Sequence, residues 1–392
     1  MTNTYKLSYT GAEIDEKLGK IDELSETKVS INPQVLTEEQ KAQARVNIGV
    51  SENTALTPDI FTGTDSEKLQ ACFDELVNTG GIIRLEREYT LSANLVISHN
   101  SNRIHRIIVR GNGKYAKINF GEFSIIDNEE TSADGGILFE DVEFVGTKTM
   151  MNAHGLIRMF FSNCTFSNFE HIIYNADGYI QTCHFTNCVI RNTTDVAIKT
   201  IATATTTQGN AGCLYDLTIT NCLIEWCAGL IEASSVHGCS VTHNCIEGFG
   251  GVPIVVRYMS RGFDICGNYF EANDSNGNGV NINISSLGYR HTAITIQNNY
   301  FAQWNGTTGV IKLPARRGIG GGIVINGNVL LPQNEYLLQI PDSVTEKLNV
   351  YAFGNVGEIS GNPLMISSLT PENVATVDEV LAALPMWEGG SY

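Results

Sequence analysis

FFSNCTF around Asn163, HFTNCVI around Asn187 and TITNCLIE around Asn221 are three copies of one phrase that recurs between residues 136 and 333. In each copy an alternating apolar segment leads into an asparagine, a small or aromatic residue and a second apolar pair. Further copies are VTHNCIE at Asn244, DICGNYFE at Asn268, IQNNYFA at Asn299 and IVINGNVL at Asn328, with LFEDVEF at Asp141 as a degenerate early one. The steps between these positions are 22, 24, 34, 23, 24, 31 and 29 residues, and such a period is typical of stacked repeats.

The residue types in the repeats favour strands. Ile, Val, Thr, Phe and Tyr alternate with polar residues at period two, whereas the leucine scaffold of leucine-rich repeats is absent. The shorter steps fit three short strands and their turns, so we predict an all-β protein, a right-handed single-stranded parallel β-helix with strands stacked about 4.8 Å apart. The repeated asparagines should form one column, each amide bonding to its equivalents in the coils above and below. The longer steps hold inserted loops at residues 200–212, 271–279 and 303–322, which project sideways.

Composition and charge exclude some classes of partner. The chain has 392 residues, 42% of them hydrophobic, and a net charge of −17. Because nucleic acids and anionic membranes attract basic surfaces, neither is expected as the main partner. The opening MTNTYKLSYTGAEIDEK lacks a secretion signal, and no apolar run is long enough for a membrane span. We therefore predict synthesis in the cytoplasm without a signal peptide, and no membrane insertion.

Four of the ten cysteines directly follow a repeat asparagine: Cys164, Cys188, Cys222 and Cys245. Because they recur at the same place in the phrase, we interpret them as small apolar residues of the core. A disulfide framework or a metal site is the alternative, but no C-x-x-C pair exists and the expected compartment is reducing. We predict no cofactor and no metal ion.

Residues 1–60 have a different pattern. Leu7, Ile14 and Ile21 recur every seven residues with Leu18 between them, which predicts either a short coiled coil that joins several chains or an ordinary amphipathic helix. The stretch LTEEQKAQARVNIGV, residues 36–50, is typical of a small helical connector.

These two leading segments carry a resemblance. YTGAEIDEKLGKIDEL, residues 9–24, followed by LTEEQKAQARVNIGV, resembles the leading segments of tail spike and tail fibre proteins of bacterial viruses. The resemblance implies that residues 1–60 attach the protein to the virion tail or baseplate and that the distal part meets the host surface. It also implies a homotrimer, made in the host cytoplasm and located in the virion.

A second resemblance covers residues 61–97. TDSEKLQACFDELVNTGGIIRLEREYTLSANLVI is similar to the entry of the pectate-lyase-like β-helix domains of viral tail spikes. Thr64 and Glu67 form a capping box, and Gly80–Gly81 ends the helix. Such a helix covers the open end of the first coil, whose strand edges would otherwise be unpaired.

The chain is thus expected to have three parts: an attachment segment at 1–60, a β-helix receptor-binding domain at 61–365 and a C-terminal cap at 366–392. The cap is predicted to be helical, because Thr376 and Glu379 suggest a second capping box and Pro385 ends the apolar pattern.

The candidate catalytic residues are Glu247, Glu271 and, in reserve, Glu225. Glu247 and Glu271 each lie three residues after a repeat asparagine, and Glu225 lies four after its own. If they share one face of adjacent coils, the spacing suits glycoside hydrolysis, in which one carboxyl protonates the leaving oxygen and the other attacks or activates water. The alternative is that each glutamate only turns to solvent at the end of its strand, and the same ambiguity holds for Glu232 and Asp264.

Candidate substrate-binding residues are Arg257, Arg261, Glu232, Asp264 and Trp304. Either arginine could hold the carboxylate of an acidic sugar or support a polysaccharide lyase, but Arg257 could equally form an ion pair. Exposed aromatic rings stack on sugars. Among Tyr258, Tyr269, Tyr289, Tyr300 and Trp304, we expect those at alternating strand positions to be buried and Trp304 to be exposed.

Two weaker patterns have structural explanations. Asp274 to Gly279 matches the start of a calcium loop but lacks its closing glutamate, so a turn is favoured. His237 and His243 flank Cys239 without a third ligand at useful spacing. The sequence therefore predicts a viral tail spike that binds a bacterial surface polysaccharide and cleaves it, with a non-catalytic receptor-binding or structural protein as the alternative and a lyase as the third possibility.

Overall fold

The structure is a computed structural model of the whole chain. It describes residues 55–97, 106–112, 116–127, 136–152, 155–176, 178–202, 212–275, 277, 279–285, 291–302, 309–313, 322–331, 336–339 and 350–357. All of them belong to the unit Glu52–Tyr392. The heptad, the connector and the predicted C-terminal cap lie outside the described residues.

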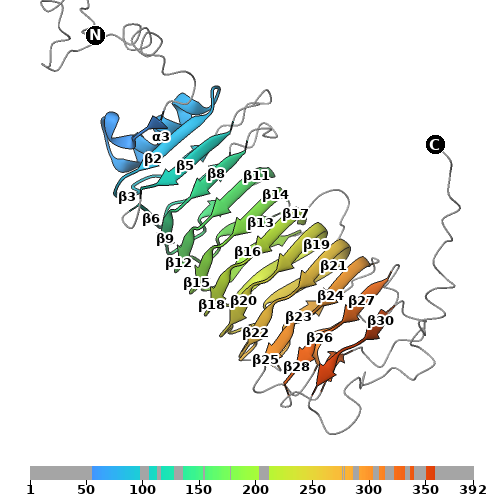
Figure 1. The fold of residues 1–392 in the computed structure, drawn as a ribbon. Coiled ribbons are helices and arrows are strands. Elements are labelled where there is room, and N and C mark those ends of the chain that lie inside the picture. The colour runs from blue at the N-terminus through green and yellow to red at the C-terminus, as the bar shows by residue number, and fades with distance from the viewer. Residues whose placement is uncertain are drawn as a thin grey trace, which may run out of the picture. The chain divides into compact units, whose positions relative to one another are not determined.

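Parallel strands wind through the described residues coil after coil (Figure 1), which confirms the parallel β-helix. One 11-stranded sheet, here the short-strand sheet, consists of β3 (Glu88–Thr90), β6 (Lys117–Gly121), β9 (Glu143–Gly146), β12 (Thr165–Ser167), β15 (Val189–Arg191), β18 (Leu223–Glu225), β20 (Cys245–Glu247), β22 (Tyr269–Glu271), β25 (Tyr300–Ala302), β28 (Val329–Leu330) and β31 (Val356–Gly357).

The other sheet has 20 strands and is here the long sheet. Its strands are β1 (Ala55–Leu56), β2 (Gly81–Leu85), β4 (Leu95–Ile97), β5 (Ile107–Gly111), β7 (Ile125–Asp127), β8 (Ile137–Glu140), β10 (Met151–Asn152), β11 (Gly155–Ser162), β13 (Ile173–Ala176), β14 (Tyr179–Thr186), β16 (Val196–Ile201), β17 (Cys213–Thr220), β19 (Gly229–Thr242), β21 (Ile254–Cys266), β23 (Ile282–Ile284), β24 (Thr292–Gln297), β26 (Gly309–Lys312), β27 (Ile323–Asn326), β29 (Tyr336–Gln339) and β30 (Val350–Phe353). It covers two faces of each coil, because the first half of β19 pairs with β16 and its second half with β17.

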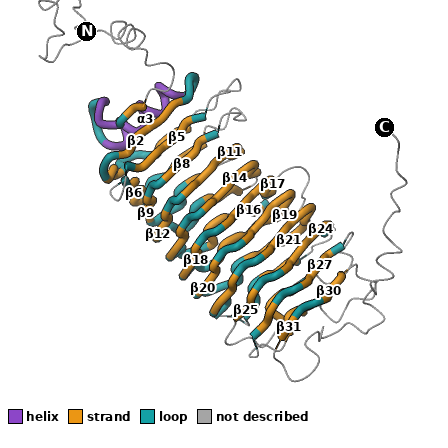
Figure 2. The backbone as a smooth tube through the Cα atoms, viewed as in Figure 1, coloured by secondary structure: helices purple, strands orange, loops and turns teal. Residues whose placement is uncertain are grey.

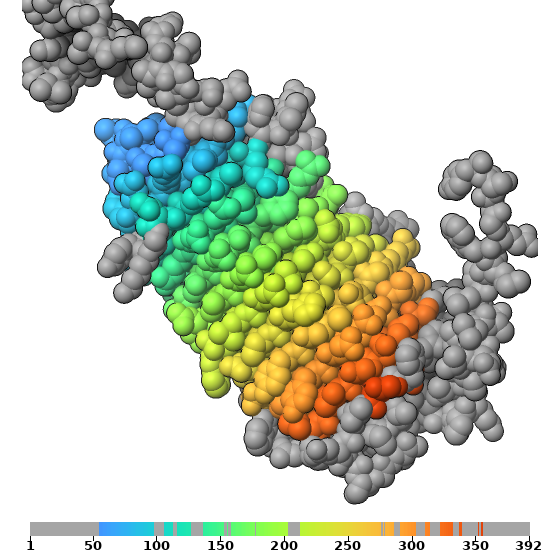
Figure 3. Space-filling model, in the orientation of Figure 1, coloured from blue at the N-terminus to red at the C-terminus, as the bar shows by residue number. Residues whose placement is uncertain are grey.

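Strands and corners alternate in the same order in successive coils (Figure 2), and the coils stack as parallel ridges on the surface (Figure 3). Because side chains alternate along a strand, one set from every strand meets inside the coil. Phe139, Phe161 and Phe185 stack there one above another, with ring centroids 5.3 and 4.8 Å apart. The inside of the coil is therefore a continuous apolar core.

The corner between the long sheet and the short-strand sheet holds the repeat asparagines, and the expectation of one column was wrong. The strand register aligns Thr165 with Val189, Leu223, Cys245 and Tyr269 in turn. The asparagines consequently occupy two adjacent columns. The first column has positive φ and contains Asp141, Asn163, Asn187, Asn221, His243, Gly267, Asn298, Gly327 and Gly354.

The second column points inward. It begins with Cys164, Cys188 and Cys222 and continues with the asparagine ladder, which we define as Asn244, Asn268, Asn299, Asn328 and Asn355. Each of the first four ladder amides donates to the next amide oxygen at 2.9–3.0 Å. The predicted amide bonds between coils therefore exist. They are formed in the second column, which in the first copies of the phrase is the position of the cysteine after the asparagine.

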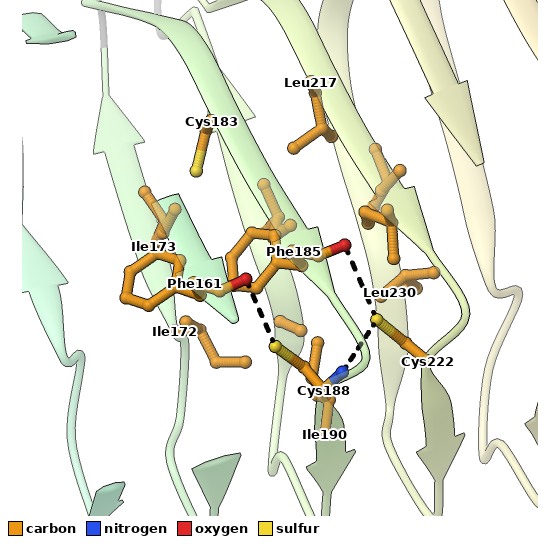
Figure 4. Packing of buried hydrophobic residues seen from close by; sticks show 14 of the residues in the cluster. Phe161, Ile172, Ile173, Cys183, Phe185, Cys188, Ile190, Leu217, Cys222 and Leu230 are labelled. Atoms are coloured by element: carbon orange, nitrogen blue, oxygen red, sulfur yellow. Dashed lines mark hydrogen bonds between the residues drawn. The ribbon is translucent and has the colours of Figure 1, made fainter. Parts of the chain in front are cut away.

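The cysteines of the second column belong to the core, as predicted. The thiols of Cys188 and Cys222 donate to the carbonyls of Phe161 and Phe185, both at 3.6 Å, and the Cys222 sulfur accepts from the backbone of Cys188 at 3.3 Å (Figure 4). Cys245 was wrongly assigned to this set, because it is one position further on and is only half-buried, on the outer face of β20. All ten cysteines are free thiols.

The predicted capping box starts helix α3 (Asp65–Leu76), with the Thr64 side chain and Glu67 bonded to each other's backbone. A short 3-10 helix, η1 (Pro58–Ile60), precedes it. The buried face of α3 includes Leu69, Cys72 and Phe73 and packs against the first coil (Figure 1). No described helix has the length and apolar content that a membrane span requires.

Candidate functional site

Three carboxylates stand side by side on the short-strand sheet. Glu225, Glu247 and Glu271 end β18, β20 and β22, and each is paired in register with the next. Adjacent strands lie about 4.8 Å apart, and all three side chains are half-buried. We call this set the carboxylate row. Glu225 lies four residues after its repeat asparagine, whereas Glu247 and Glu271 lie three after theirs. The three glutamates still align, because Asn221 is in the first corner column and Asn244 and Asn268 are in the second.

Aromatic rings lie next to the row. Tyr269 and Tyr300 stack with centroids 5.5 Å apart and planes 8° apart, on the outer face of β22 and β25. They are half-buried, so the expectation that tyrosines at strand positions belong to the core was wrong for these two. The Tyr269 hydroxyl donates to Glu271 Oε2 at 2.6 Å, and this bond raises the pKa of Tyr269 to about 12.

The carboxylate row affects the pKa of the Cys245 thiol. The thiol lies 3.7 Å from Glu247 Oε2. Burial, followed by the charge of Glu247 and its hydrogen bond with the thiol, raises the pKa of Cys245 to about 11, and Glu271 and Glu225 act in the same direction. Because a thiol with a raised pKa is a poor nucleophile at neutral pH, Cys245 is not a candidate for covalent catalysis.

Trp226 is a residue of this site that the sequence interpretation missed. It follows Glu225 at the end of β18 and is 62% exposed. Its φ of 55° is an outlier for a bulky residue and costs about 1–3 kcal/mol. The two preceding coils have Asn168 and Asn192 at the equivalent corner, both with positive φ. The sequence signal that could have identified this residue is a tryptophan at the corner position that asparagine occupies in the two preceding coils.

Glu232 and Arg257 lie on the long sheet and bind each other. Glu232 is almost fully buried and forms ion pairs with Arg257 and, at 3.7 Å, with Lys199. Lys199 also binds Asp195 at 2.7 Å. The ion-pair alternative for Arg257 is therefore the one the structure shows, and the arginine is not beside the carboxylate row.

Arg261 and Asp264 also lie on the long sheet, on β21. Arg261 is paired in register with His237, and Asp264 with Ser240. Burial raises the pKa of Asp264, and His243 across the corner opposes this effect. Neither residue belongs to the set that contains Glu225, Glu247 and Glu271.

Trp304 and Tyr289 lie outside the described residues. Asp274 accepts a hydrogen bond from the backbone of Val280 at 3.0 Å, in keeping with a turn. The His237 ring packs against the Tyr215 ring with centroids 4.8 Å apart, which gives His237 a structural role.

No protein-family model matches this sequence, and no curated protein does. Solved structures with a similar fold include the tailspike protein of Acinetobacter baumannii phage AM24, with TM-score 0.47, 15% identity and coverage of 79% of this chain and 55% of that one. The chain thus spans little more than half the length of that protein. The Dettilon tailspike protein has TM-score 0.39 and 12% identity, with 86% of this chain and 72% of that one covered.

The GH136 lacto-N-biosidase from Eubacterium ramulus has TM-score 0.44 and 11% identity, with 89% of this chain and 75% of that one covered. At such identities and TM-scores these likenesses do not identify what the present chain binds or cleaves. The chain is a parallel β-helix protein with a row of three carboxylates beside stacked aromatic rings on one of its sheets.

Proposed function

We propose that this protein is a tail spike or tail fibre of a bacterial virus that binds a bacterial surface polysaccharide and cleaves it as an endo-glycosidase. The observation that carries the proposal is the register of Glu225, Glu247 and Glu271 on three consecutive strands. Carboxylates recur here at one position of the coil, next to rings that suit sugars.

The spacing matches glycoside hydrolysis. The backbones of Glu247 and Glu271 are one strand spacing apart, about 4.8 Å, and those of Glu225 and Glu271 are two spacings apart. Carboxyl groups that keep these spacings would suit retaining enzymes, at about 5–5.5 Å, or inverting ones, at about 6.5–9.5 Å. Glu271 accepts the hydrogen bond of Tyr269 and is oriented by it, which suits the nucleophile or base. Glu247 lies between the other two and is placed to protonate the leaving oxygen, with Glu225 in reserve.

A lyase is less well supported. It would need a basic group to remove the proton next to an acidic sugar's carboxylate, and the two arginines considered for this role lie on the long sheet, Arg257 bound to Glu232. A non-catalytic receptor-binding protein would use the same face for binding alone.

Cleavage of a polysaccharide panel distinguishes these functions. The full chain is incubated with purified capsules and O-antigens, and the size and reducing ends of the products are measured. We expect Glu247→Gln and Glu271→Gln to lower the rate by about 10²–10⁴-fold. Glu143→Gln, on the same sheet at β9, is the matched control and should retain activity.

Each alternative has its own outcome. Products with an unsaturated uronate would favour the lyase. Binding without release would leave the receptor-binding function. Cleavage that survives both glutamine variants would exclude the carboxylate row from catalysis.

The finer assignments are part of the proposal. The predicted 1–60 segment attaches the protein to the virion tail or baseplate through residues 1–54, because β1 and η1 at its end belong to the β-helix, and three copies form a trimer. Both assignments are supported by the resemblance of the leading segments and, for the trimer, by the heptad of Leu7, Ile14 and Ile21.

A further inference from the structure

Trp226 is the most exposed large apolar side chain among the described residues, ahead of Ile60 at 58%. We propose that Trp226 forms the floor of a sugar subsite at the edge of the carboxylate row and that this subsite takes an uncharged pyranose ring. The inference rests on the proposed function, since it assumes that a glycan lies along the row.

The indole ring is held in place by the next coil. A Cβ atom added to Gly248 would lie 2.8 Å from Cε3 of Trp226 and 3.1 Å from Cδ2 and Cζ3. The six-membered part of the indole therefore lies against the Gly248 backbone, and a larger residue at this position would displace the ring. Because the ring is already positioned, a sugar that stacks on it does not have to order a mobile side chain.

The position of the ring ties it to the carboxylates. Trp226 follows Glu225 in the chain, and its backbone N–H donates to the carbonyl of Glu247 at 3.0 Å. Gly248, beneath the ring, follows Glu247. A glycan that reached Glu225 and Glu247 would therefore pass beside the indole.

The backbone at Trp226 is suited to a different residue. Asn168 and Asn192 precede it at the same corner, and Gly248 and Ala272 follow it, all with positive φ. Asparagine and glycine adopt this conformation readily, whereas tryptophan does so only under strain. Backbone strain of this kind gathers at functional sites, and the stacking face that it exposes is the feature that asparagine would lack.

The charges around Trp226 select the class of sugar. The strands β18, β20, β22 and β25 contain three glutamates and no lysine or arginine. The nearest cation in register is Arg191, one strand before Glu225. Three glutamates against this one guanidinium leave a net negative charge beside Trp226, and like charges repel, so a uronate or sialate ring is disfavoured. The apolar face of an uncharged pyranose, in contrast, stacks on an indole.

Trp226→Asn tests the subsite, because asparagine is the residue of the two preceding coils. The full chain and the variant are compared on an array of bacterial glycans sorted by charge, and their melting temperatures are measured in parallel. We expect the wild type to prefer uncharged glycans. The variant should bind them about 5- to 10-fold more weakly and melt at the same or a higher temperature.

Two further variants serve as controls for the loss of the indole. Trp226→Tyr keeps an aromatic face and should retain most of the binding. Ile60→Asn removes a side chain of similar exposure beside α3 and should leave binding unchanged.

The remaining outcomes overturn the inference in distinguishable ways. Equal binding by wild type and Trp226→Asn would remove Trp226 from the site while leaving the proposed function intact. A preference for acidic glycans would refute the uncharged subsite. A loss of binding that accompanies dissociation of the Trp226→Asn chains would make the indole a contact between copies. A wild type that neither binds nor cleaves any glycan would refute the proposed function and the subsite together.

Discussion

Each inner asparagine of the ladder satisfies its polar groups through the neighbouring coils. The Asn268 side-chain oxygen accepts from the backbone and side-chain amides of Asn244 at 3.0 Å. Its own amide donates to Asn299 at 3.0 Å and to the carbonyl of Val241 at 2.8 Å. Since every donor and acceptor of this buried amide is used, loss of one side chain leaves several groups without partners.

Asn268→Ala should therefore be strongly destabilising, by about 3–5 kcal/mol, measured by denaturant unfolding. Asn268→Cys is the matched comparison, because cysteine fills this column in three earlier coils, and it should cost less than half as much. A loss of only about 1 kcal/mol or less for Asn268→Ala would contradict the importance of the amide bonds.

His291 should make the protein sensitive to mild acid. It is fully buried, with Nδ1 3.1 Å from the Ser260 hydroxyl and Nε2 3.0 Å from the Ser285 carbonyl. Burial lowers its pKa from 6.5 to about 4. Between these values only the unfolded chain takes up the proton, so stability falls as the pH drops from 6.5 to 4, by roughly 3 kcal/mol, and no further below that.

His291→Gln should remove this part of the pH dependence. Glutamine can still donate to one partner and accept from the other but does not titrate. Melting temperatures of the wild type and the variant at pH 7 and pH 4.5 provide the measurement. An identical drop in both proteins would show that other groups are responsible.

At the scale of elements, Arg87 is the positively charged side chain among the contacts that join helix α3 to the first coil. Arg87 lies between Asp59 of η1 and Asp65 at the start of α3, with Nη2 2.6 and 2.8 Å from their oxygens. Asp65 also accepts from the backbone of Thr90 in β3 at 2.9 Å. The hydrogen bonds with Arg87 hold the pKa of both carboxyls below their usual range.

Arg87→Gln should loosen α3. Carboxyls with lowered pKa stabilise the fold above their unfolded pKa of about 4, and that stabilisation is lost as the pH falls through the lower folded value. Hydrogen exchange of α3, corrected for intrinsic rates, should be faster in the variant at pH 7 and depend less on acidification. Arg84→Gln, three residues earlier on β2, is the control. Unchanged protection of α3 in the Arg87 variant would refute this role.

At the scale of the whole molecule, the coil repeats along one axis, and each coil contacts mainly its neighbours. We predict that the full chain sediments with three times the mass of one chain. Replacing Ile14 and Leu18 together by aspartate should weaken the trimer if the heptad holds it, while the circular dichroism of the β-helix stays unchanged. A monomeric wild type would contradict the trimer.

The repeat pattern was sufficient to predict the architecture. A strand pattern with period two that recurs every 22 to 34 residues allows few folds other than a stack of coils. The capping box at Thr64 and Glu67 predicted where α3 begins. Local signals suffice for these features because alternation and capping depend on residues close together in the chain.

The register, in contrast, depends on contacts between coils that are distant in the chain. Asn221 and Asn244 are both followed by cysteine, yet Asn221 is in the first corner column and Asn244 is in the second. The backbone pairing between coils determines which column each asparagine occupies. A shift of one residue turns a side chain from the core to the surface. For this reason the exposed side of Cys245, the alignment of Glu225 and the contact of Trp226 with Gly248 could be found only in the folded coil.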